Sequence, residues 1–320
     1  MRGLGRQDVA GLLAAFALGL DGRLSDGPVA SGRLGSIWRL DTDAGTWAVK
    51  QVGEIDEVGL REVLEGAAFE EAARAAGIRT PEVRRTAAGD VIATIGDVRA
   101  RVHSWVDMDP PDIAVDPVAV GRLVARLHQV DIMGTIGVDP WYTEPVGASR
   151  WAETVDALRA RGAPFADELD ALMPELVALE AFLGGPLRSV RTCHRDLWAD
   201  NVRMTADGEL CVFDFDNAGL NDPSQELAAV LVEYAGADST RARAIVGAYA
   251  DAGGPGRVAG PRDFAMPIAQ LCHIAQEGCR RWLISTTDEQ RADNEGWVRE
   301  FLDRPITPAL IGQILAAISS

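Results

Sequence analysis

The stretch that decides the fold lies in the second half of the chain. It begins as His194-Arg195-Asp196-Leu197-Trp198-Ala199-Asp200-Asn201 and continues, a few residues later, as Glu209-Leu210-Cys211-Val212-Phe213-Asp214-Phe215-Asp216. Between the two parts stands Ala206-Asp207-Gly208, which is typical of a hairpin turn. The order is therefore a polar loop, a strand, a turn, a second strand and an acid at the strand end. This full order is much rarer than a chance match to its first three residues.

The spacing resembles a kinase catalytic loop, in which Asn follows five residues after the Asp of H-x-D. In such a loop the Asp orients and deprotonates the attacking hydroxyl, and the Asn holds a metal ion. Asp196 is therefore the candidate catalytic base, and Asn201 is a candidate Mg²⁺ ligand. Asp214 is the second candidate ligand, on the phosphate side. The structural alternative is a capped turn followed by a carboxylate at a strand end.

The glycine of the kinase D-F-G motif is missing, and this departure is informative. The chain instead reads Asp214-Phe215-Asp216-Asn217-Ala218-Gly219 and then Asn221-Asp222-Pro223-Ser224-Gln225-Glu226-Leu227-Ala228. It resembles the aminoglycoside phosphotransferase and choline kinase-like family, although Glu226 stands where that family usually has Asp. Weaker similarities are Leu123-Val124-Ala125-Arg126-Leu127-His128 and Gly77-Ile78-Arg79-Thr80-Pro81. The resemblance covers about residues 47–235.

The resemblance implies an α+β, two-lobed protein-kinase-like fold. A small N-lobe would carry a five-stranded antiparallel sheet and one main helix, and a larger helical C-lobe would lie beyond it, with ATP between them. Met108-Asp109-Pro110-Pro111 breaks the strand pattern and marks the hinge. We therefore expect a nucleotide-binding N-lobe over residues 1–105 and a C-lobe with the catalytic loop and acceptor pocket over residues 106–320.

Alternating residues predict strands near residues 36–42, 46–52, 91–95 and 98–103, and a helix over residues 58–76. The apolar run near the N-terminus predicts an opening helix with Asp8 as its N-cap and Gly22 as its stop. A signal peptide is the alternative for this run, but no clear small-residue cleavage site follows it.

Lys50 ends Trp47-Ala48-Val49-Lys50, which matches the strand that carries the phosphate-binding lysine of kinases. Alone, this lysine would be read as an exposed strand residue; together with the catalytic loop it is expected to contact the α- and β-phosphates. Such a lysine needs a carboxylate partner from the following helix. The candidates are Glu62, Glu65, Glu70 and Glu71; the family resemblance places Glu65 there, with Glu70 as the runner-up.

The remaining nucleotide contacts carry weaker signals. Gly32 and Gly35 form a G-x-x-G rather than a full glycine loop, and Gly32 with the hydroxyl of Ser31 is expected near the phosphates. The chain order of the family implies that the segment of Ser104 and Val106 supplies backbone groups to adenine.

Composition limits the partners. The 320 residues carry a net charge of −17, which argues against a nucleic-acid surface. No apolar run approaches the roughly 20 residues of a membrane helix. The four cysteines form no C-x-x-C pair, which fits a reducing cytoplasm. The acidity has two interpretations, solubility or attraction of a cationic substrate.

The expected activity is ATP-dependent O-phosphorylation of a small hydroxylated molecule, with an aminoglycoside or another cationic antibiotic favoured. A metabolite kinase for a sugar or amino alcohol is the alternative, and an inactive nucleotide-binding scaffold is a third. The candidate acceptor contacts are Asp200, Asp216, Asp222 and Glu277. Asp216 is open to two other roles, a second metal contact or a turn cap. His128, His194 and Glu226 are expected to brace the catalytic loop.

Overall fold

A computed structural model describes residues 2–32, 35–53 and 55–319. The chain divides into two compact units: unit 1 is Met1–Asp112, Val130–Ile136 and Asp196–Gly219, and unit 2 is Ile113–Gln129, Gly137–Arg195 and Leu220–Ser320. This differs from two lobes that are each continuous in sequence. The predicted hairpin belongs to unit 1 because its backbone bonds to it: Val212 N donates to the carbonyl of Arg79 at 3.0 Å, and Met108 bridges to Thr205.

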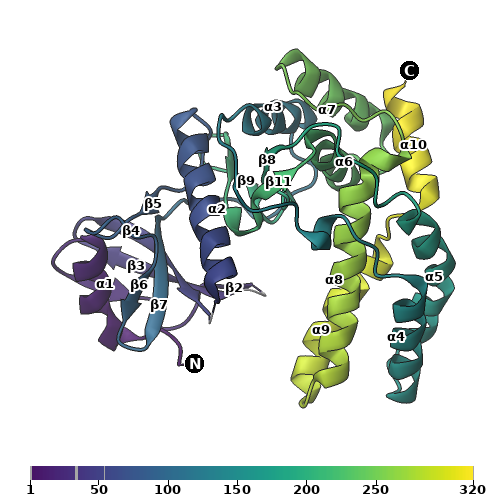
Figure 1. Ribbon diagram of the computed structural model, residues 1–320. Helices are drawn as coiled ribbons and strands as arrows, with labels where there is room; N and C mark the ends of the chain where they lie inside the picture. Colours follow the sequence, from purple (N-terminus) through teal and green to yellow (C-terminus); the bar gives the residue numbers. More distant parts are fainter. Residues whose placement is uncertain (1, 33–34, 54, 320) are drawn as a thin grey trace. The chain divides into compact units, whose positions relative to one another are not determined.

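The α+β class predicted from the sequence is confirmed, and the sheet of unit 1 is antiparallel throughout (Figure 1). Its main path runs β1-β3-β4-β7-β5, with β2 paired to β3 and β6 paired to β7, so the described sheet has seven strands rather than five. The strands are β1 (Gly22–Leu24), β2 (Ala30–Gly32), β3 (Gly35–Thr42), β4 (Gly45–Val52), β5 (Val83–Arg84), β6 (Ala93–Ile95) and β7 (Val98–Ser104).

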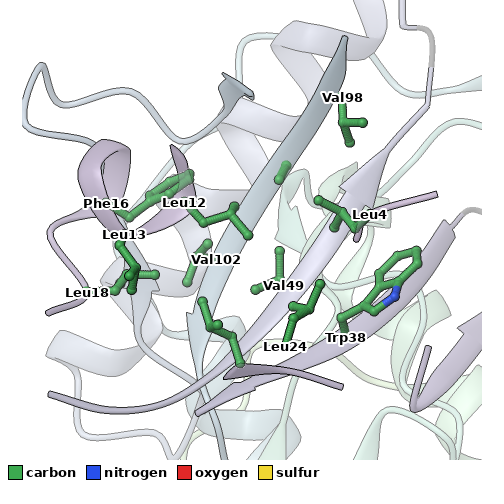
Figure 2. Close-up of a cluster of buried hydrophobic side chains, with 12 residues drawn as sticks. Leu4, Leu12, Leu13, Phe16, Leu18, Leu24, Trp38, Val49, Val98 and Val102 are labelled. Carbon is green, nitrogen blue, oxygen red and sulfur yellow. The ribbon is translucent and has the colours of Figure 1, made fainter. Parts of the chain in front are cut away.

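One face of this sheet forms an apolar core with the first helix. Figure 2 shows the cluster, in which Leu12 and Phe16 of α1 (Val9–Phe16) gather with Val49 of β4 and Val102 of β7. Strand side chains alternate between the two faces of a sheet. Because Val49 faces α1, the adjacent Lys50 faces away from this core.

The opening helix is shorter than the sequence predicts. It follows the 3₁₀ turn η1 (Arg6–Asp8) and ends at Phe16, where Ala17 adopts a left-handed conformation with φ of 52°. The prediction of Gly22 as the stop is therefore wrong, and Gly22 begins β1. Asp8 makes no side-chain cap of α1, because its carboxylate binds the Arg2 guanidinium at 2.6 Å.

Helix α2 (Glu57–Ala75) begins where Asp56 caps the amide of Gly59 at 2.9 Å. Its middle lies against η3 (Phe215–Asn217), where the rings of Phe69 and Phe215 meet edge to face with centroids 5.4 Å apart. The hairpin that leads to η3 is β9 (Val202–Met204) and β10 (Leu210–Val212).

Unit 2 is mainly helical. The long helix α8 packs against α9, α6 and α4, and α3 packs against α7 (Figure 1). Its helices are α3 (Pro117–His128), η2 (Pro140–Tyr142), α4 (Ala148–Ala160), α5 (Ala166–Glu180), α6 (Pro223–Tyr234), α7 (Ser239–Asp251), η4 (Pro261–Phe264), α8 (Ala265–Ile284), α9 (Asp288–Asp303) and α10 (Pro308–Ile318). Strand β8 (Arg191–Cys193) pairs with β11 (Gly219–Asn221). Within the described ranges no helix by itself has the length and apolarity to cross a membrane, and the bent pair α9 and α10 passes that test only jointly.

Candidate active site

The open end of the β9–β10 hairpin brings the two predicted metal ligands to one place. The last pair of the ladder is Val202 with Val212, so Asn201 and Phe213 follow directly on the two strands. The amide of Phe213 donates to the carbonyl of Asn201 at 3.1 Å. Asp214 is the next residue. Carboxylate and amide oxygens are the ligands that Mg²⁺ prefers, so this donor set fits the ion.

Asp196 is held by two side-chain amides that donate to the same carboxylate oxygen. Asn201 Nδ2 lies 2.8 Å and Asn217 Nδ2 lies 3.0 Å from Asp196 Oδ2. Asn201 Nδ2 also lies 3.0 Å from the backbone carbonyl of Asp196. Since the nitrogen of the Asn201 amide faces Asp196, its oxygen is directed elsewhere and is suited to a cation.

The backbone of Asp214 adopts a left-handed conformation. Its φ is 59°, and the φ of Arg195 is 63°. Such values cost energy in residues other than glycine and cluster at functional sites, although Asp tolerates them better than most residues. The turn at Asp214 redirects the chain from β10 into η3, which places Asp214, Asp216 and Asn217 close together.

Lys50 binds two carboxylates of this turn. Its Nζ lies 2.8 Å from Asp214 Oδ1 and 2.7 Å from Asp216 Oδ2. The other oxygen of Asp216 accepts a short hydrogen bond from Arg101, which pairs with Lys50 across β4 and β7. Burial favours the neutral forms, but the two carboxylates outweigh it and raise the pKa of Lys50. Arg101 and Lys50 in turn hold the pKa of Asp216 well below its usual range, against the effect of burial.

The predicted pairing of Lys50 with a glutamate of α2 is wrong in this structure. Glu65 instead accepts from the backbone amide of Thr135 at 2.9 Å and from its hydroxyl. The alternative, Glu70, is buried and lies 3.3 Å from His103 Nε2. Glu65 and Glu70 therefore bind other partners, and Asp216 of η3 supplies an acid for Lys50.

The residues just before Asp196 are braced within unit 2, as the sequence predicts. Glu226 is fully buried and accepts from the backbone amides of His194 and Arg195. His128 Nε2 lies 2.7 Å from the same carboxylate, and its Nδ1 lies 2.8 Å from the hydroxyl of Tyr249. Burial opposes ionisation of Glu226, but the hydrogen bond from His128 and nearby positive charge lower its pKa.

This buried network includes Cys193. A cysteine, a histidine and a carboxylate here bring possible metal-ligating atoms within 4.8 Å of one another. However, His128 and Glu226 bind each other, and burial raises the pKa of the Cys193 thiol well above its ordinary value. The group therefore has the character of a structural network.

Three of the four predicted acceptor contacts have other partners. Asp222 is buried at the start of α6, where it caps the amide of Ser224 at 2.9 Å and accepts from Arg188 N at 2.9 Å. Glu277 binds Arg280 and Arg281, which lower its pKa to about 2 against the effect of burial. Asp216 holds Lys50. These three carboxylates therefore have partners within the chain, whereas Asp200 is an exposed candidate, and the acceptor contacts stay predictions.

The weaker predictions of nucleotide contacts stay predictions. Gly32 pairs with Gly35 and Ser31 with Ser36 in the β2–β3 hairpin, but the side chain of Ser31 lies outside the described residues. The amide of Ser104 donates to the carbonyl of Glu82 at 2.9 Å, and that of Trp105 donates to Thr46 at 2.9 Å. Val106 follows beyond these bonds, so its amide is the better candidate for adenine.

Sequence reasoning missed Arg101 and Asn217. A signal for Arg101 was present, because Arg99, Arg101 and His103 alternate with the apolar residues of β7. A buried arginine on a strand requires an acid opposite it, and Asp216 supplies one for Arg101. No sequence pattern near Asn217 indicated its hydrogen bond to Asp196.

The match to known proteins agrees with this geometry. Residues 27–261 match the model of the phosphotransferase enzyme family, and the chain belongs to that family. It is thus an ATP-dependent small-molecule phosphotransferase with the predicted protein-kinase-like fold. No curated protein matches the sequence significantly.

Solved structures share this fold at low sequence identity. Spectinomycin phosphotransferase, APH(9)-Ia, in complex with ADP and spectinomycin, has a TM-score of 0.68 and 13% identity, and the match covers 99% of each chain. An aminoglycoside phosphotransferase from Alicyclobacillus acidocaldarius has a TM-score of 0.62 and 16% identity, covering 100% of this chain and 98% of the other. The microcompartment-associated aminopropanol kinase has a TM-score of 0.56 and 15% identity, covering 93% and 94%.

Proposed function

We propose that the protein transfers the γ-phosphoryl group of Mg-ATP to a hydroxyl of an aminoglycoside or another cationic antibiotic. The observation that supports this most is the gathering of Asp196, Asn201, Asp214 and Lys50 around one hairpin end and one sheet strand. These are the groups that phosphoryl transfer requires, since the reaction depends on positioning and charge neutralisation.

Each residue has a separate task in this proposal. Asp196, oriented by Asn201 and Asn217, accepts the proton of the acceptor hydroxyl as that oxygen attacks the γ-phosphorus. Asp214 and the amide oxygen of Asn201 hold Mg²⁺, which neutralises charge on the phosphates. Lys50 contacts the α- and β-phosphates. Glu226 keeps the segment before Asp196 in place through the backbone amides of His194 and Arg195.

A cationic acceptor is supported by the net charge of −17 and by the exposed carboxylate of Asp200 beside the catalytic segment. Carboxylates around a site raise the local concentration of cations. Among the similar structures, one holds spectinomycin and another is an amicoumacin kinase.

A screen of ADP release in the presence of Mg-ATP tests the proposal. The panel contains aminoglycosides, peptide and macrolide antibiotics, neutral sugars and small amino alcohols. We expect an aminoglycoside or another cationic antibiotic to give the highest kcat/KM. Its KM should rise with added salt, because exposed charges are screened over a Debye length of about 8 Å at physiological ionic strength. A neutral sugar or macrolide as best acceptor, with a salt-insensitive KM, contradicts the cationic assignment.

A metabolite kinase for an amino alcohol is the second candidate. The observation that favours it is the similarity to aminopropanol kinase and to a choline/ethanolamine kinase family protein from Mesorhizobium loti. The same screen separates this function from that of an antibiotic phosphotransferase. If the protein is an amino alcohol kinase, an amino alcohol will give a higher kcat/KM than every antibiotic. Binding of Mg-ATP without turnover on any acceptor would indicate a scaffold.

A further inference from the structure

The acid that binds the phosphate lysine comes from an unexpected element. Lys50 Nζ is 2.7 Å from Asp216 Oδ2, and both side chains are largely buried, with 13% and 17% of their surface exposed. Asp216 lies on η3, two residues after the predicted metal ligand. Its second oxygen is bound by Arg101, whose side chain is only 4% exposed. Asp216 is thus fixed from one side and presents its other oxygen to Lys50.

Arg101 and Lys50 are cross-strand neighbours on β7 and β4, and their side chains share one face of the sheet. Two adjacent buried cations repel each other, and an acid that lies between them offsets this repulsion by attracting both. Asp216 occupies that position with one oxygen for each cation. Charge-assisted bonds of this kind are short and directional, so they define where the lysine amine lies.

Asp214 is a less permanent partner of Lys50. Its side chain is 38% exposed, and its carboxylate is the group that Mg²⁺ would take. A carboxylate that binds the metal ion makes a weaker hydrogen bond to the lysine. Asp216 remains bound to Lys50 and Arg101 in either case, since it lies deeper and already has both of its oxygens occupied.

From these contacts we infer that Asp216, fixed by Arg101, is the positioning residue that holds Lys50 for the nucleotide phosphates, in place of a glutamate from α2. Asp214 is then free to exchange Lys50 for the metal ion. This inference rests on the proposed function, in which Lys50 contacts the phosphates. It assigns no substrate contact to Asp216 or Arg101.

A double-mutant cycle tests the inference. Its variants are Asp216→Asn, Lys50→Met and the two combined; Asp41→Asn, which breaks an exposed ion pair with Arg39 on β3, serves as the matched control. The Kd of Mg-ATP is measured by calorimetry, kcat with the best acceptor of the screen, and apo stability by chemical unfolding. A cycle isolates the part of each effect that passes through Lys50.

We expect Asp216→Asn to lower kcat by about 10- to 100-fold, the size of a lost charge-assisted hydrogen bond. In the Lys50→Met background the same change should alter kcat and the Kd of Mg-ATP by less than about 3-fold, the usual error of additivity. Asp216→Glu should restore part of the loss, and Asp41→Asn should behave like the wild type. Glu65→Gln should leave the Kd of Mg-ATP within about 3-fold of the wild type.

Three results would overturn the inference. An effect of Asp216→Asn that persists undiminished in the Lys50→Met background would mean that Asp216 acts independently of Lys50. A loss of Mg-ATP affinity in Glu65→Gln, with none in Asp216→Asn, would return the role to α2. If the wild type binds no Mg-ATP, the proposed function fails, but the unfolding cycle still decides whether Lys50 and Asp216 are coupled. Additive unfolding effects would then refute the pairing.

Discussion

Replacing Gly66 by alanine is expected to damage the active site from a helix that carries none of the catalytic residues. Gly66 lies in the middle of α2, where a β-carbon would come 2.3 Å from the carbonyl oxygen of Phe215. Ordinary contact begins at 3.4 Å, so the two atoms must separate by about 1.1 Å. Phe215 lies between Asp214 and Asp216, and any shift of its carbonyl moves the carboxylates that bind Lys50.

The effects on stability and on catalysis should differ in size. Overpacking lowers the free energy of unfolding by about 1–3 kcal/mol. Alanine in place of glycine raises it by about 1 kcal/mol, because alanine has the higher helix propensity. The net loss of unfolding free energy is therefore about 0–2 kcal/mol. A displacement near 1 Å of catalytic groups can reduce the rate by about 100-fold. We expect kcat to fall by about two orders of magnitude while the protein stays folded.

The assay is ADP release with the best acceptor, together with thermal unfolding and calorimetric binding of Mg-ATP. Gly247→Ala is the matched control, because it is also a helical glycine but has open space at the β-carbon. This control should raise Tm slightly and leave kcat unchanged. A wild-type kcat in Gly66→Ala, combined with a raised Tm, would show that η3 accommodates the added β-carbon without moving the site. This result would refute the reasoning.

Three further predictions concern single groups. Asp196→Ala should lower turnover by about 10²–10⁴-fold with a nearly unchanged Kd of Mg-ATP, and turnover near the wild-type value would contradict its role as base. Asp214→Ala should remove the Mg²⁺ dependence of ATP affinity in calorimetry, and full retention of that dependence would exclude Asp214 as the ligand. Glu226 has a pKa below its ordinary value of 4.5, so its ionisation stabilises the fold above that pH and the gain is lost as pH falls below it. Glu226→Gln should therefore show a shallower fall of Tm under acid than the wild type, and identical acid profiles would contradict this.

The parts of the site that the sequence predicted are those with local signals. The hairpin followed from a turn between two short strands, and its register alone brings Asn201 next to Asp214. Lys50 followed from its place within an alternating strand. Each of these inferences needed a window of about twenty residues or fewer.

The parts that were missed or misassigned depend on pairs far apart in the chain. Arg101 and Asp216 are separated by 115 residues, and no spacing rule connects them. Glu65 lies at the position expected for the lysine partner, yet Thr135 offers it an amide and a hydroxyl. The acidity of Asp222 alone suggests an acceptor contact, whereas its position directly before Pro223 suits a helix cap, and Asp222 caps α6.

The turn that carries Asp216 also accounts for the glycine at position 66 of α2. With Asp at position 216, η3 gains a side chain that binds Lys50 and Arg101, and the turn that carries it packs closely against α2. The close approach brings the carbonyl of Phe215 to where a β-carbon at position 66 would lie. The clash involves backbone rather than the Asp216 side chain, so Asp216→Gly would remove the lysine partner without making room for alanine at position 66. The close approach of the Phe215 backbone, and not the side chain at position 216, is therefore what favours glycine at position 66.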